Sequence, residues 1–121
     1  MAIKKTLVLG ASANPARYSN MAVKKLSAFN HPVIALGNRM GNIGTIIIET
    51  EKKRFEEIDT VTVYLNPQNQ AEYYDYILSL KPKRIIFNPG SENETLESLA
   101  KNNNIEAVEA CTLVLLSTGH Y

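Results

Sequence analysis

The part of the chain best suited to ligand chemistry is the loop that follows its first apolar run, Thr6 to Leu9. That run is typical of a buried parallel strand, and an amphipathic helical pattern begins after Asn20. The loop turns at Gly10 and continues with small residues, which allow a ligand to approach the backbone closely. Free N–H groups and the positive end of a helix meet at such a place, so it can hold a phosphate group. We therefore expect Gly10, Ala11, Ser12 and Ala13 to contact an anion, with Arg17 as a forked donor.

The loop lacks the two familiar nucleotide signatures. The dinucleotide pattern G-x-G-x-x-G needs glycine where Ser12 and Pro15 stand, and the Gly-Lys-Ser/Thr of a P-loop does not follow. Taken alone, the loop is therefore also consistent with an ordinary turn between a strand and a helix.

A second signal follows the next apolar run, Val33–Leu36. A site for NAD places Asp or Glu there to bind the ribose 2′-hydroxyl, whereas this chain has Gly37-Asn38-Arg39 and no carboxylate before Glu49. An arginine at this position suits a ligand whose ribose carries a phosphate, as in NADP or coenzyme A. The alternative is a surface arginine in a turn.

Apolar runs alternate with helical patterns along the rest of the chain, which predicts an α/β fold with a doubly wound parallel sheet of about five strands in three layers. Ligands bind such sheets at the carboxyl ends of the strands, where the strand order reverses. Besides the two runs above, we expect strands at Thr60–Leu65, Arg84–Phe87 and Ile105–Val108, and a short strand or an ordered crossover at Ile46–Ile48. We expect helices at Met21–Phe29, Gln68–Leu80 and Leu113–Leu116. A further helix is expected after Ser91, which would cap it together with Glu94. Phe55–Ile58 is expected to form one helical turn.

Length and composition limit the classes of protein to which this chain can belong. The 121 residues suit one domain, and the only cysteine, Cys111, has no partner for a disulfide within the chain, which favours a reducing compartment. The 13 Lys and Arg nearly balance the 12 Asp and Glu, so a basic surface for nucleic acid is not expected. We find neither a signal peptide nor an apolar run near the ~20 residues of a membrane span. We expect a cytoplasmic protein that binds neither nucleic acid nor membrane.

The order of several short motifs resembles the small stand-alone CoA-binding proteins, which are single Rossmann-like domains related to the CoA-binding domain of the succinyl-CoA synthetase α subunit. The resemblance covers essentially the whole chain, as one domain over residues 1–121. The motifs are Gly10-Ala11-Ser12, Ser19-Asn20, Gly37-Asn38-Arg39 followed by Gly41 and Gly44, Asn66-Pro67, Asn88-Pro89-Gly90 and Glu109-Ala110-Cys111.

The resemblance implies a site for coenzyme A or a related nucleotide. On these positions the residues from Gly10 to Ala13 would meet the pyrophosphate, and Arg17 and Arg39 would meet phosphate groups. Asn38 would meet the ribose or adenine, and Asn66 and Pro67 would lie along the adenine or pantetheine path. Family members often carry a longer and more polar first loop, and a proline where this chain has Asn38. Ligase activity is not implied, because the synthetase's phosphohistidine domain and nucleotide-grasp partner are missing.

The sequence shows no catalytic constellation and no metal-ligand spacing. Of the two histidines, His31 is expected at the sheet edge opposite the predicted site, and His120 lies beside the last residue. Cys111 is either a thiol that faces the ligand or a small buried apolar residue. The leading hypothesis is non-catalytic binding of coenzyme A or an acyl-CoA. The alternatives are an NADP-binding, reductase-like protein, and a scaffold or dimerisation unit with a decayed nucleotide site. A homodimer or an enzyme partner is compatible with each hypothesis.

Overall fold

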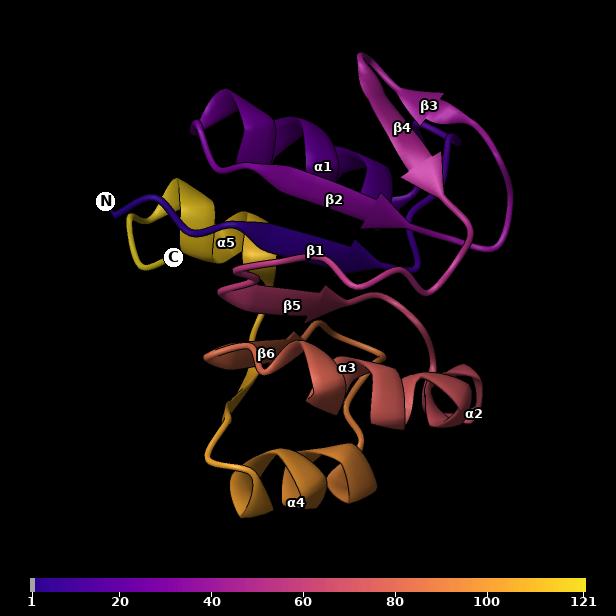
Figure 1. Ribbon diagram of the computed structural model, residues 1–121. Coiled ribbons are helices and arrows are strands. Elements are labelled where there is room, and N and C mark those ends of the chain that lie inside the picture. The colour runs from indigo at the N-terminus through magenta and orange to yellow at the C-terminus, as the bar shows by residue number, and fades with distance from the viewer. Residues whose placement is uncertain (1) are drawn as a thin grey trace.

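The computed structural model describes residues 2–121, and its centre is one seven-stranded sheet (Figure 1). The strand order is β3-β4-β2-β1-β5-β6-β7, and every neighbouring pair is parallel except β3 and β4. The strands are β1 (Thr6–Leu9), β2 (Val33–Leu36), β3 (Asn42–Ile43), β4 (Ile46–Glu49), β5 (Thr60–Val63), β6 (Arg84–Phe87) and β7 (Glu106–Glu109).

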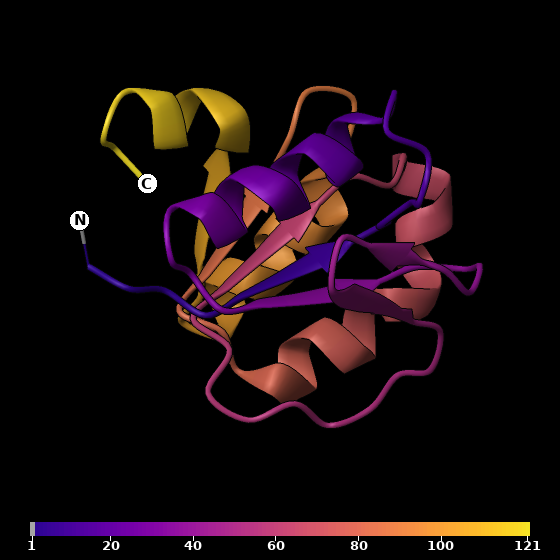
Figure 2. The same cartoon turned by 90° about the horizontal axis from the view of Figure 1, so that it is seen from above.

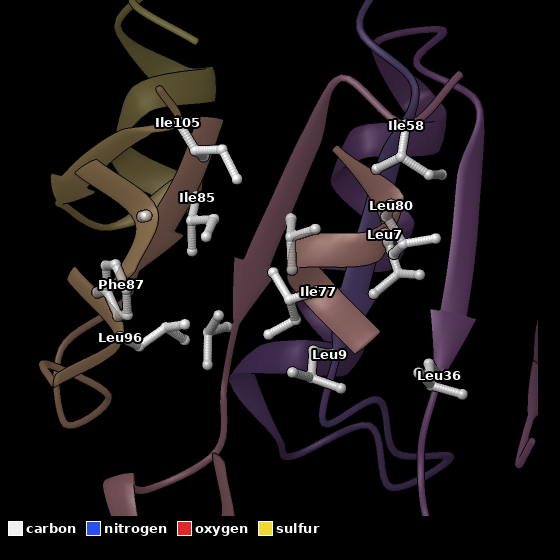
Figure 3. Packing of buried hydrophobic residues seen from close by; sticks show 13 residues of the cluster. Leu7, Leu9, Leu36, Ile58, Ile77, Leu80, Ile85, Phe87, Leu96 and Ile105 are labelled. Carbon is white, nitrogen blue, oxygen red and sulfur yellow. The ribbon is translucent and has the colours of Figure 1, made fainter. Parts of the chain in front are cut away.

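Helices cover both faces of the sheet, which gives the predicted three layers (Figure 2). Their bounds are α1 (Tyr18–Ala28), α2 (Pro67–Gln70), the 3₁₀ turn η1 (Ala71–Tyr73), α3 (Tyr74–Leu80), α4 (Glu94–Asn102) and α5 (Thr112–Ser117). Alternate residues of β1 enter different cores, because side chains of a strand point to opposite faces. Leu7 and Leu9 pack with Ile77 of α3 and Leu96 of α4, as Figure 3 shows, whereas Val8 packs in the cluster that α1 and α5 supply.

The predicted α/β class and doubly wound parallel sheet are confirmed. The sheet has seven strands rather than about five, because Ile46–Glu49 is the strand β4 and Asn42–Ile43 folds back beside it as β3. The predicted helical segment near the C-terminal end is present as α5.

Three local predictions differ from the structure. Phe55–Ile58 is not helical. The crossover from β4 to β5 that contains it is instead bonded to α3, with the Tyr76 hydroxyl donating to the Lys53 carbonyl at 2.6 Å. The helix predicted at Gln68–Leu80 begins at Pro67 and is interrupted by η1. The cap of α4 is Asn93 and not Ser91, because the Asn93 side chain accepts the Leu96 N–H.

Tyr121 packs at the amino ends of the strands, the edge at which His31 was expected. Tyr121 is buried, its hydroxyl is hydrogen-bonded to Thr6, and its ring lies 4.9 Å from the His31 ring. The Nδ1 atom of His31 accepts the backbone N–H of Lys4 at 2.9 Å. Burial, together with the nearby charges of Lys4 and Arg84, lowers the pKa of His31.

The two edges of the sheet differ. One edge ends in the two-residue strand β3, and the other ends in the four-residue strand β7 (Figure 1). The outer residues of β7, Glu106 and Glu109, are exposed. Within residues 2–121, no helix combines the length and the apolar character that crossing a membrane requires.

Candidate functional site

The carboxyl ends of β1, β2, β5 and β6 border a cavity of about 820 Å³. β1 lies between β2 and β5, so the chain leaves β1 toward one side of the sheet and later crosses to the other. The cavity therefore lies where the strand order reverses, which is where open α/β sheets bind ligands. Its volume falls within the range of small-molecule and cofactor sites.

Ten of the predicted site residues line this cavity, and they come from four separate loops. They are Gly10, Ala11, Ser12, Arg17, Ser19, Gly37, Asn38, Arg39, Asn66 and Pro89. The topology of the sheet, rather than closeness in the sequence, brings them together.

The first loop is held by its own backbone and leaves several amides free. The N–H groups of Gly10 and Ala11 both donate to the Leu36 carbonyl at 2.9 Å, which ties the loop to the end of β2. Across residues 2–121, the N–H groups of Ser12, Tyr18 and Ser19 have no acceptor in the protein, and all three residues line the cavity. Tyr18 and Ser19 open α1, whose N-terminus has no side-chain cap. These donors and the positive helix end are therefore available to an anion.

Two arginines stand at the same cavity without a carboxylate partner. Among the described residues, neither Arg17 nor Arg39 forms an ion pair or a side-chain hydrogen bond, and both are exposed. The only carboxylate in the cavity lining is Glu72, and its Oε2 lies 3.9 Å from the Nζ of Lys52. The cavity consequently has an excess of positive charge, which favours an anionic ligand.

The first two loops approach each other so closely that one position must be glycine. A Cβ atom on Gly37 would lie 2.4 Å from the carbonyl oxygen of Ala11 and 3.2 Å from Cγ2 of Ile48. Glycine at position 37 therefore lets the loop after β2 contact the backbone of the loop after β1.

The remaining predicted site residues lie outside the cavity lining, and most have a visible structural role. Asn20 is buried and donates to the Ser12 carbonyl at 2.9 Å, which braces the first loop. Asn88 is buried with its amide engaged by Thr62 and Val63 and by the Thr112 N–H. The other three are Ala13, which is exposed, Pro67, which is the first residue of α2, and Cys111, which is partly buried at the N-cap of α5.

Several lining residues were not singled out from the sequence. They are Asn14, Tyr18, Tyr64, Leu65, Asn69, Glu72 and Tyr73. Gly90 of the Asn88-Pro89-Gly90 motif and Ser91, the predicted helix cap, also line the cavity. Most of them are close in the sequence to a predicted site residue, whereas Glu72 and Tyr73 lie in η1. Burial raises the pKa of Tyr64, and burial together with Glu72 raises that of Tyr73, so both phenols are neutral at physiological pH.

The described part of the chain contains no group of three or more His, Cys, Asp and Glu side chains placed to hold a metal ion. The cavity lining contains neither histidine nor cysteine. The chemistry that it offers is hydrogen bonding and positive charge.

Comparison with known proteins agrees with this geometry. A crystal structure of an uncharacterized protein is 50% identical over 100% of both chains, with a TM-score of 0.98. A hypothetical protein from Pyrococcus horikoshii OT3 has a TM-score of 0.87 at 19% identity, covering 96% of this chain and 83% of its own. The structure of cell-free ID.343 from Thermus thermophilus has a TM-score of 0.84 at 20% identity, covering 98% of this chain and 91% of its own. The two distant structures support the fold alone.

A search of the curated proteins gives no significant match. The family model described as "CoA binding domain" matches residues 4–117, which include every strand, every helix and the whole lining of the cavity. The chain therefore belongs to the CoA binding domain family.

Proposed function

We propose that the chain binds coenzyme A or an acyl-CoA in the cavity at the carboxyl edge of the sheet, and that it holds this ligand without transforming it. The observation that carries the proposal is the convergence of free donors on one cavity. The free amides of Ser12, Tyr18 and Ser19 and the unpaired side chains of Arg17 and Arg39 all belong to its lining.

This donor set fits the phosphates of coenzyme A. The pyrophosphate would lie against the first loop and the N-terminus of α1, where backbone donors and the helix dipole favour negative charge. Arg39, after β2, would contact the phosphate on the ribose as a charge-assisted pair, with Asn38 beside the ribose or adenine. The polar side chains of Asn66 and Asn69 and the apolar side chain of Leu65 line the opposite wall and would accompany the pantetheine arm.

The composition of the lining supports a passive role. Proton transfer in enzymes is most often carried out by histidine or by a carboxylate of shifted pKa. The cavity offers only Glu72 as a carboxylate, and Lys52 lies beside it. Two tyrosines of the lining, Tyr64 and Tyr73, have raised pKa values and hold their protons.

Isothermal calorimetry with coenzyme A, dephospho-CoA, NADP and NAD tests the proposal. We expect coenzyme A to bind more tightly than dephospho-CoA, by about 1–3 kcal/mol for the lost charge-assisted contact. Tighter binding of NADP than of coenzyme A would instead favour the NADP hypothesis, because Arg39 suits a 2′-phosphate equally well. NAD binding as tightly as coenzyme A would contradict the role of Arg39.

A further inference from the structure

A buried amide side chain connects the two loops that form one wall of the cavity. Gln70, the last residue of α2, is completely buried. Its Nε2 donates one hydrogen bond to the Leu65 carbonyl and a second to the Ser91 carbonyl, each at 2.8 Å. Leu65 follows β5 and Ser91 follows β6, and both line the cavity.

The other end of the same amide is fixed as well. The Oε1 atom of Gln70 accepts from Nδ2 of Asn93 at 3.0 Å, and that Nδ2 also donates to the Tyr74 hydroxyl at 2.8 Å. The Oδ1 atom of Asn93 accepts the N–H of Leu96, which caps α4. Gln70 is thus held in one orientation by a network that reaches α3 and α4.

The amide of Gln70 satisfies two carbonyl groups that would otherwise repel each other. A buried carbonyl without a donor is unfavourable, so loss of the amide would drive the two loops apart or let water enter between them. The start of the loop after β6 is fixed by the buried Asn88 side chain, whereas its tip has only short-range bonds of its own, from the Ser91 N–H to the Asn88 carbonyl and from the Gly90 N–H to Oε1 of Glu92, each at 2.8 Å. A wall fixed before the ligand arrives binds more tightly, because no loop has to be ordered on binding.

We propose that Gln70 is a positioning residue whose amide sets the spacing of the Leu65 and Ser91 loops and thereby raises the affinity of the cavity for its ligand. This inference rests on the proposed binding of coenzyme A. Gln70 does not itself line the cavity, so it acts through the two loops.

The first test replaces the amide with an apolar side chain of similar length, Gln70→Met. The control is Ile77→Val, which removes one methylene from a completely buried residue of α3. The Ile77 side chain cannot form hydrogen bonds to the two loops. Thermal melts establish that both variants fold cooperatively. Calorimetry should then show a roughly three- to tenfold weaker affinity for coenzyme A in Gln70→Met alone, since loops that are free must be ordered on binding. Equal affinities in Gln70→Met and the unchanged chain would overturn the inference while the proposed function stands.

A ligand-free measurement separates the two proposals. In ¹H–¹⁵N spectra of Gln70→Met we expect the amide signals of Leu65 and Ser91 to shift or broaden, while that of Ser12 keeps its position. If the unchanged chain fails to bind coenzyme A, the proposed function is wrong, and these spectra still decide whether Gln70 positions the wall. Unchanged Leu65 and Ser91 signals would contradict the inference.

A second variant provides a pH-dependent signature. In Gln70→Glu the ionised carboxylate would face two carbonyl oxygens, whereas the protonated acid can donate to one of them. Burial raises the pKa of such a carboxyl. We therefore expect the affinity of Gln70→Glu for coenzyme A to rise relative to that of the unchanged chain as the pH falls from about 8 to about 6. A constant ratio of the two affinities would argue against the role of the donor.

Discussion

Replacing Gly37 with alanine tests the close contact between the first two loops. The added Cβ would lie 2.4 Å from the Ala11 carbonyl oxygen, and real Cβ atoms essentially never come nearer than 3.0 Å to another heavy atom. One of the two loops must therefore move by at least about 0.6 Å, and the obstacle is backbone, which cannot rotate away as a side chain does. Overpacking of this kind costs about 1–3 kcal/mol, and we expect the upper part of that range for Gly37→Ala.

Urea unfolding measures this loss of stability, provided that the slope of the free energy with denaturant stays unchanged. Gly44→Ala is the matched control, because a Cβ there meets no atom within 4 Å and only the φ of +60° opposes it. The left-handed backbone alone should cost about 1 kcal/mol. Because Ala11 lines the cavity, Gly37→Ala should also weaken binding of coenzyme A, whereas Gly44→Ala should not. A Gly37→Ala protein with unchanged stability and unchanged affinity would refute this account of the contact.

Three further changes probe other parts of the molecule. Arg39→Gln should weaken binding of coenzyme A by about 1–3 kcal/mol and leave dephospho-CoA unaffected in calorimetry; equal losses for both ligands would remove Arg39 from the ribose phosphate. Ser12→Ala should cost about 1 kcal/mol of binding energy or less, whereas Ser12→Asp should nearly abolish binding with a melt that shows the fold intact, since a carboxylate would stand where the anion belongs. The pKa of His31 is lowered in the folded chain, so the unfolded state binds more protons just below pH 6.5. The free energy of unfolding should therefore decrease below about pH 6.5, by up to about 1.4 kcal/mol for each pH unit. His31→Asn keeps an acceptor for Lys4 without a titrating ring and should flatten this slope in urea unfolding at about pH 7.5 and pH 5.5; an unchanged slope would assign the effect to other groups.

The sheet could be predicted from the sequence because its signal is local. β1, β2 and β6 coincide with short apolar runs, β5 with a run of β-branched residues, and β7 with the predicted Ile105–Val108 segment shifted by one residue. Parallel order follows from the helices that alternate with most of these strands. Parallel order in turn places the loops after the strands at one edge, so most candidate residues could be assigned to one site before any contact was known.

The features that could not be predicted depend on contacts between distant segments. The non-helical crossover after β4 is bonded to α3 through Tyr76 and Lys53, and this pair is separated by 23 residues. Asn93 rather than Ser91 caps α4, and the same Asn93 side chain is bonded through its Nδ2 to Gln70, 23 residues earlier in the chain. Asn88 lies in a predicted site motif, yet its amide is engaged by β5 and α5, which a motif does not reveal.

The exposed edge strand β7 affects how copies of this protein meet in solution. An open strand edge offers unpaired N–H and C=O groups to other chains, and aggregation by edge-to-edge pairing is the usual hazard. If two β7 strands paired antiparallel about their centres, Glu106 of each copy would stand opposite Glu109 of the other. Like charges directly across a strand pair are destabilising, so the two glutamates oppose such self-association at neutral pH.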